Sequence, residues 1–106
     1  MKAPGALEVD VLLAVGRHDD EAYGLLVLDE VSEARGRQYS VGAIYTTLSR
    51  LEAKGLLSSR TTEPLAMRGG RSRRQYRLTA AARTVLAVER ARTLQRWTGE
   101  PGWAHA

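Results

Sequence analysis

Hydrophobic residues recur at helical spacing in residues 40–57, which read SVGAIYTTLSRLEAKGLL. At about 100° per residue, the apolar side chains fall on one narrow stripe, made of Val41, Ile44, Leu48 and Leu51. The opposite side carries small, hydroxyl-bearing and basic residues, namely Gly42, Ala43, Thr46, Ser49, Arg50 and Ala53. Ser40 is expected to cap the first turn and Gly55 to follow the last. The pattern predicts a helix with an apolar back and a thin polar front.

Two further helices are predicted before this segment. The first covers residues 7–16, where apolar residues repeat at helical spacing until Gly16. The second covers residues 21–34, with an inner stripe of Val27, Leu28 and Val31 and an end at Gly36. Gly24 fits either close packing against a neighbouring helix or a tolerated glycine. Because only residues 37–39 separate the second helix from the third, the two are expected to form a helix-turn-helix.

A hairpin and a final helix are predicted after Gly55. Residues 57–62 favour extended structure, residues 63–70 contain Pro64 and paired glycines, and residues 74–78 read as a return strand. Strand, loop and strand after a helix-turn-helix form a wing. Thr79 is expected to cap a helix that runs to about Trp97. The predicted fold class is mainly α with a small β-wing: a winged helix-turn-helix over residues 1–79, a C-terminal dimerisation helix over 80–98 and a flexible tail over 99–106.

The polar front of the 40–54 helix suits the major groove of DNA. It has little bulk, several hydrogen-bonding groups, and no acid before Glu52, so phosphates would not repel it. An ordinary amphipathic helix with a solvated face remains the alternative. For Tyr45, a phosphate contact and packing at the edge of the core both stay open. The residues expected to bind DNA from this helix are Ser40, Ala43, Tyr45, Thr46, Thr47, Ser49 and Arg50.

Arginines are concentrated in the predicted wing. Five occur among ten residues, at positions 68, 71, 73, 74 and 77, and no acid lies between Pro64 and Val88. The chain carries a net charge of +4. A basic cluster on a glycine-containing loop suits phosphates or a narrow minor groove, although a solvated loop without a partner is the alternative. Beside the polar helix, we expect Arg71, Arg73 and Arg74 to contact the DNA backbone.

Composition narrows the classes of function. Cysteine is absent, which excludes disulfide scaffolds, thiolate metal sites and thiol catalysis. The two histidines, His18 and His105, have no metal-ligand spacing. No apolar run reaches the length of a membrane span and no signal peptide is evident. We therefore expect no enzymatic activity, no metal, no cofactor, no membrane partner and a cytoplasmic location.

The last predicted helix carries an apolar face that a small domain has little room to cover. The residues expected in this face are Val85, Leu86, Leu94 and Trp97. A second copy of the chain, packed helix against helix, is the expected partner. The alternative is that the helix folds back on its own domain. Trp97 fits either a packing anchor or the wall of a cavity for a small planar effector between the subunits.

Three stretches carry a resemblance to a known family. They are residues 22–24 (AYG), residues 42–56 (GAIYTTLSRLEAKGL) and residues 69–79 (GGRSRRQYRLT). In their order and spacing they resemble the PadR family of bacterial transcriptional regulators, over about residues 7–86. The resemblance implies a winged helix-turn-helix, a homodimer held by the C-terminal helix and repression at inverted-repeat promoters. It is closest to the short members, some of which bind planar drugs between tryptophans at the dimer centre.

Two positions depart from the family pattern. Val41 stands where many members have proline, which should matter little in a first helical turn, and Gln75 stands where a second aromatic residue is common. The expected function is a sequence-specific DNA-binding regulator, a repressor that binds an inverted repeat as a homodimer. The alternatives are a winged-helix module that binds protein without specific DNA binding, and a regulator whose DNA binding responds to an effector.

Overall fold

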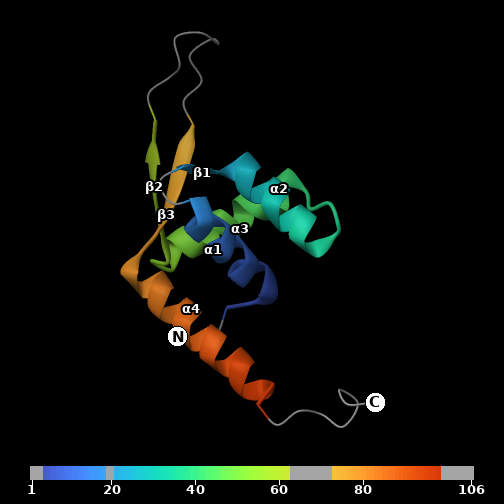
Figure 1. The fold of residues 1–106 in the computed structure, drawn as a ribbon. Coiled ribbons are helices and arrows are strands. Elements are labelled where there is room, and N and C mark those ends of the chain that lie inside the picture. Colours follow the sequence, from blue (N-terminus) through green and yellow to red (C-terminus); the bar gives the residue numbers. More distant parts are fainter. Residues whose placement is uncertain (1–3, 19–20, 63–72, 99–106) are drawn as a thin grey trace.

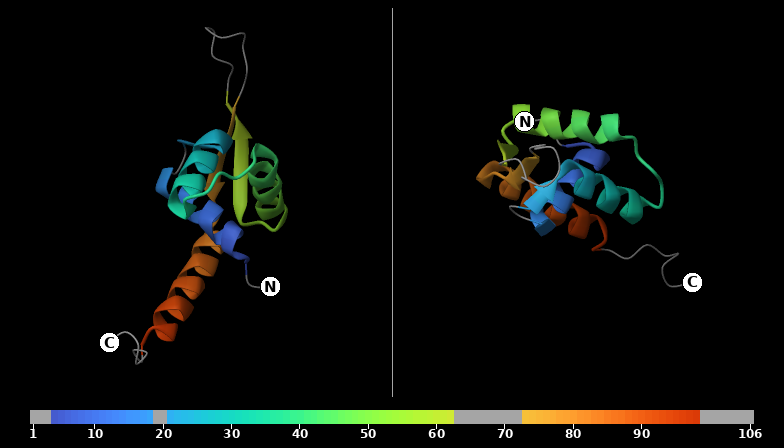
Figure 2. Two further views of the ribbon diagram at one scale, coloured as in Figure 1. Left: turned by 90° about the vertical axis from the view of Figure 1, so that its right-hand side faces the viewer. Right: turned by 90° about the horizontal axis from the view of Figure 1, so that it is seen from above.

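The computed structural model describes residues 4–18, 21–62 and 73–98 (Figure 1). It has four helices and three strands within this part, in the order α1 (Ala6–His18), β1 (Ala22–Tyr23), α2 (Gly24–Arg35), α3 (Val41–Ala53), β2 (Leu57–Thr61), β3 (Arg74–Leu78) and α4 (Ala80–Arg96). Helices α1, α2 and α3 and the sheet enclose one core, whereas α4 extends away from it (Figures 1 and 2). No helix among the described residues is long and apolar enough to cross a membrane.

The core is built from the inner faces predicted by helical periodicity. Its largest fully buried side chains include Leu12 of α1, Val27 of α2, Leu48 of α3 and Leu56. The stripe of α2 predicted from sequence is buried throughout. On α3 the prediction was right for Ile44, Leu48 and Leu51, which are inaccessible, but wrong for Val41, which is 49% exposed. Val41 is the first residue of α3.

The starts of α3 and α4 and the ends of α2 and α3 follow the predicted capping residues, whereas α1 continues past Gly16, its predicted end, to His18. The Ser40 hydroxyl accepts from the Ala43 N–H at 3.0 Å, and the Thr79 hydroxyl accepts from the Ala82 N–H at 3.2 Å. Gly36 and Gly55 end α2 and α3 with φ of 65° and 77°, a conformation that glycine adopts without steric cost. Gly36, Ser40 and Gly55 lie in the two turns that flank α3.

The sheet is antiparallel with the order β1-β3-β2. Strands β2 and β3 pair from Leu57 opposite Leu78 to Thr61 opposite Arg74, and this hairpin is called the wing below. The hairpin confirms the predicted strands; the loop expected over 63–70 lies outside the described residues. Strand β1 was missed, since residues 22 and 23 had been assigned to α2. Two residues carry no periodicity of their own, and they are extended because β3 pairs with them.

Candidate nucleic-acid interface

The exposed side of α3 forms a shallow hollow on the surface. Six residues line it, and none is acidic: Gly42, Tyr45, Thr46, Ser49, Arg50 and Ala53. The side chains of Thr46, Ser49 and Arg50 are exposed. Gly42 faces open space, since a Cβ atom there would meet nothing within 4 Å. The structure thus brings together the thin, acid-free face that the periodicity predicted, with hydroxyl and guanidinium groups among small apolar surfaces.

Thr47 does not belong to this face, so its expected contact with DNA was wrong. Its side chain is 7% exposed, and its hydroxyl donates to the Ala43 carbonyl at 2.8 Å. Thr47 follows Ile44 by three positions, so it lies over the same inner side of the helix. Ser40 and Ala43 lie at the start of α3, where Ser40 is exposed, Ala43 is half-buried and the Ser40 hydroxyl is used by the cap.

Tyr45 packs against α2 while keeping part of its surface accessible. A Cβ atom on Gly24 would lie 2.4 Å from Tyr45 Cζ and 2.4 Å from its hydroxyl oxygen, which leaves room only for glycine with the ring in place. Close packing, one of the two readings of Gly24, is therefore the correct one. The Tyr45 side chain remains 39% exposed. It therefore closes the edge between α2 and α3 and also borders the hollow.

Arg73 and Arg74 leave the wing on opposite faces, because successive side chains of a strand alternate. Arg74 shares a face with Tyr76, which is buried, and this face is directed at α3. Its Nη1 donates to the Ser59 hydroxyl at 3.0 Å and lies 3.8 Å from Glu52 Oε1. The Ser59 hydroxyl donates to Glu52 Oε2 at 2.6 Å. The acid at the end of α3 is thus engaged by the wing and turned away from the hollow.

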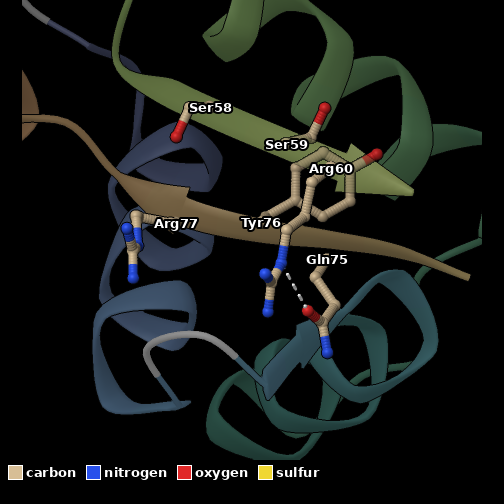
Figure 3. A pocket seen from close by; sticks show the side chains of 6 residues that line it. All are labelled: Ser58, Ser59, Arg60, Gln75, Tyr76 and Arg77. Atoms are coloured by element: carbon tan, nitrogen blue, oxygen red, sulfur yellow. Dashed lines mark hydrogen bonds between the residues drawn. The ribbon is translucent and has the colours of Figure 1, made fainter. Parts of the chain in front are cut away.

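Arg73 belongs to the outer face of the wing. Its guanidinium carbon lies 5.2 Å from the centre of the Tyr23 ring, which comes from β1. On the same face, Arg60 crosses β3 and donates to Gln75 Oε1 at 3.0 Å (Figure 3). Gln75 Nε2 in turn donates to the Tyr23 hydroxyl at 2.7 Å. Arg71, also predicted to contact DNA, lies outside the described residues.

Sequence reasoning missed Arg60 and Tyr23 as neighbours of Arg73. Period-two alternation could have placed Arg60 on one face of β2, and it also separates Arg73 from Arg74. The position of Tyr23 had no local signal, because it depends on pairing between β1 and a strand about fifty residues later. On the other hand, Gln75, noted as a departure from the family, is the side chain that joins the three strands on this face.

Ion pairs tie α1 to the helices that carry the site. The Lys54 ammonium donates to Glu8 at 2.7 Å, and this hydrogen bond lowers the pKa of Glu8. Arg35 donates to Asp10 at 2.5 Å, which raises the pKa of Arg35. Burial raises the pKa of the Tyr76 hydroxyl above its ordinary value. Each of these groups supports the frame and none is aimed at the hollow.

No group of three metal-ligating side chains occurs within the described ranges. His18 Nε2 lies 2.7 Å from Glu30 Oε1, so this histidine joins α1 to α2. Its environment is a partly buried contact between two helices, and it is the only histidine among the residues that the structure describes.

Helix α4 divides into two parts. Val85 and Leu86 pack against the core of their own domain and are partly buried. Farther along, the helix has left the domain (Figure 2), and Leu94 and Trp97 are 57% and 58% exposed. The alternative that α4 folds back on its own domain thus holds for its first turns, while the second half presents large apolar side chains.

The helix-turn-helix, the wing beside it and the projecting fourth helix define a winged helix-turn-helix protein. The family model described as "Transcriptional regulator PadR-like family" matches residues 11–88. The chain therefore belongs to the PadR-like family of transcriptional regulators.

The chain is also similar to individual known proteins. The transcriptional regulator Rv3488 of Mycobacterium tuberculosis is 42% identical over 72 residues, which cover 68% of this chain and 63% of that protein. The chain thus spans less than two thirds of that relative. A PadR-like transcription factor from Bacteroides fragilis superposes with a TM-score of 0.70 at 26% identity, covering 84% of this chain and 81% of that one. RosR of H. salinarum, at 22% identity, shares the fold with a TM-score of 0.75 over 94% of this chain and 83% of that chain.

Proposed function

We propose that the chain is a sequence-specific DNA-binding repressor that acts as a homodimer on an inverted-repeat operator. The observation that carries the proposal is the acid-free hollow on α3 beside an arginine-bearing wing. Glu52, the acid nearest to it on α3, is held by Ser59 and Arg74. A surface of this kind can approach a phosphate backbone without paying for repulsion.

In the proposed complex, α3 enters the major groove. Thr46, Ser49 and Arg50 are exposed on its hollow face and carry the hydrogen-bonding groups for base edges or phosphates. Arginine is the residue best suited to a bidentate contact with guanine. Ser40 and Ala43, at the N-terminal turn, and Tyr45, at the edge of the hollow, approach the backbone. Thr47 is left out because its side chain is buried.

The wing contacts the DNA backbone in this proposal. Arg73 and Arg74 project from opposite faces of β3 and are both exposed. A wing that lies along a groove has a phosphate strand on each side, so each arginine can approach a different strand. Arg71, which lies outside the described residues, is proposed to add a third positive charge to this contact.

Two copies are proposed to meet through α4, with residues 1–79 as the DNA-binding domain and residues 80–98 as the dimerisation helix. The exposed Leu94 and Trp97 would supply the centre of this interface, and Val85 and Leu86 its edge nearest the domain. Half-sites would then be about one helical turn of DNA apart, roughly 34–36 Å. Trp97 also provides an aromatic wall for a small planar effector at the dimer centre. We place the regulator in the cytoplasm and assign it no enzymatic role.

The test is binding to a labelled duplex from the gene's own upstream region and to a scrambled duplex of equal length, across a salt series. The proposal expects the native duplex to be preferred by about a thousandfold or more at physiological salt. Affinity should fall steeply as salt rises, since phosphate contacts release counterions. Absence of binding to either duplex at low salt would contradict the proposal and favour the module that binds protein.

A further inference from the structure

The outer face of the wing carries a cluster in which only Arg73 has a role in the proposed function. It consists of Tyr23, Arg60, Thr62, Arg73 and Gln75, contributed by all three strands, by the residue that follows β2 and by the residue that precedes β3. Every one of its polar contacts leads toward Arg73 or toward the aromatic ring beneath it. This arrangement suggests that the cluster fixes one side chain in place.

The main chain of Arg73 is held by Thr62. The Thr62 N–H donates to the Arg73 carbonyl at 2.7 Å, and the Thr62 hydroxyl donates to the same oxygen at 3.0 Å. The Arg73 N–H donates back to the Thr62 hydroxyl at 3.2 Å. Arg73 and Thr62 are the last described residues on either side of the loop. Their contacts extend the β2–β3 pairing by one step and fix where the Arg73 side chain begins.

The other end of the side chain is held by Tyr23. The guanidinium lies over the ring at 5.2 Å from its centre, within the range of a cation–π contact. Tyr23 pairs with Gln75 across the two strands, so Arg73 is its diagonal neighbour on the same face. The ring cannot turn away freely, because Gln75 Nε2 donates to its hydroxyl at 2.7 Å and Gln75 is itself held by Arg60.

We propose that Tyr23 is a positioning residue for DNA binding: its ring, fixed by Gln75, holds the Arg73 guanidinium ready for a DNA phosphate. The proposal rests on the proposed function. A guanidinium that lies over a ring keeps its N–H donors at its edge, where they can still bind a phosphate in bidentate fashion. A long side chain that is ordered before binding loses less freedom when it binds. Thr62 is also a positioning residue in this proposal, because its hydrogen bonds hold the main chain of Arg73.

The test is a double-mutant cycle for DNA affinity with Tyr23→Leu, Arg73→Gln and both together. The probe is a labelled duplex of mixed sequence at low salt, because a phosphate contact contributes to binding of any sequence. Each single variant should weaken binding about three- to tenfold. The double variant should bind no more weakly than Arg73→Gln alone, because Tyr23 acts only through Arg73.

The salt dependence gives a readout that a purely structural role would not change. Arg73→Gln should reduce the slope of log affinity against log salt by about one. Tyr23→Leu should also reduce this slope, although it removes no charge. As a matched control, Tyr23→Leu combined with Arg74→Gln should show the full loss from both changes, since Arg74 lies on the other face.

Thr62→Val provides an independent variant if Tyr23→Leu does not fold. It removes the hydroxyl that hydrogen-bonds the main chain of Arg73. Its effect on DNA affinity should also disappear in the Arg73→Gln background. The proposal would be overturned if Tyr23→Leu lowered DNA affinity by the same factor in the unmodified chain and in the Arg73→Gln background and left the salt slope unchanged. If the unmodified chain binds no duplex at low salt, the proposed function fails and this inference falls with it; binding with additive losses overturns the inference alone.

Discussion

At the scale of single residues, two glycines of the helix-turn-helix have opposite requirements. Gly55 has φ of 77° and open space around the position of a Cβ atom, so its backbone conformation alone requires glycine. Gly42 lies inside α3 and also faces open space, but its φ is that of a helix. The first glycine therefore stabilises the turn, whereas the second weakens the helix and leaves its surface thin.

Alanine at these two positions should therefore change stability in opposite directions. Gly55→Ala should lower the free energy of unfolding by about 1 kcal/mol, because alanine is strained in the left-handed region. Gly42→Ala should raise it by roughly 0.5–1 kcal/mol, since alanine is the better helix former. Chemical denaturation of both variants measures the two changes. A loss of stability in Gly42→Ala would contradict the open space at that position.

At the scale of helices and strands, most elements could be predicted because their signals are local. Helical periodicity, the capping residues Ser40 and Thr79 and the glycines after α2 and α3 all act within a few residues. Period-two alternation with a glycine pair predicted the wing. Strand β1 was not predicted, since it depends on a pairing partner that lies elsewhere in the chain. The burial of Thr47 was missed for another reason: its helical spacing from Ile44 indicates the inner side of α3, but its hydroxyl was taken as a mark of the polar front. The candidate site divides in the same way. The polar side of α3 could be predicted from helical periodicity, whereas the contact between the Tyr23 ring and Arg73 could not, because it depends on pairing between distant strands.

The ion pair between α1 and the end of α3 makes a prediction about pH. The hydrogen bond from Lys54 lowers the pKa of Glu8 below its ordinary value of 4.5. A carboxyl whose pKa is lower in the folded chain stabilises the fold above the unfolded-state pKa, and this contribution is lost as pH falls through the folded-state pKa. Glu8→Gln should therefore lower stability at pH 7 by less than about 1 kcal/mol. The difference from the unmodified chain should vanish at pH values well below 4.5.

Thermal melting at pH 7 and at acid pH compares the two proteins. Lys54→Gln is the matched variant, and it should reproduce the loss at pH 7. A difference that persists undiminished in acid would show that Glu8 acts through packing and not through its charge.

At the scale of the whole molecule, α4 and the wing extend from opposite ends of the core (Figures 1 and 2). The projecting half of α4 exposes Leu94 and Trp97, and burial of such side chains against another surface would stabilise the helix. In the proposed dimer that surface is α4 of a second copy. The spacing of the two α3 helices on DNA would then be fixed by this one contact.

Leu94→Asp should therefore favour the monomer, because a carboxylate at the centre of an apolar interface loses its hydration without a partner. Analytical ultracentrifugation over a range of concentrations should show the dissociation constant of the dimer rising by about tenfold or more. Thr93→Asp, a neighbouring exposed position on α4, adds the same charge and serves as the control. A dimer that is unaffected by Leu94→Asp would place the interface on another surface.

If α3 reads DNA sequence, the ratio of affinities for the operator and for a scrambled duplex depends on Arg50, and Arg50→Ala tests this dependence. Removal of a base-reading arginine should lower this ratio by about tenfold or more, because one good bidentate contact contributes roughly 1–3 kcal/mol of discrimination. Arg83→Ala, which removes the same charge from exposed surface on α4, should leave the ratio unchanged. If Arg50→Ala weakens both duplexes equally and keeps the ratio, Arg50 contacts only phosphate, and the assignment of sequence reading to this face of α3 is contradicted.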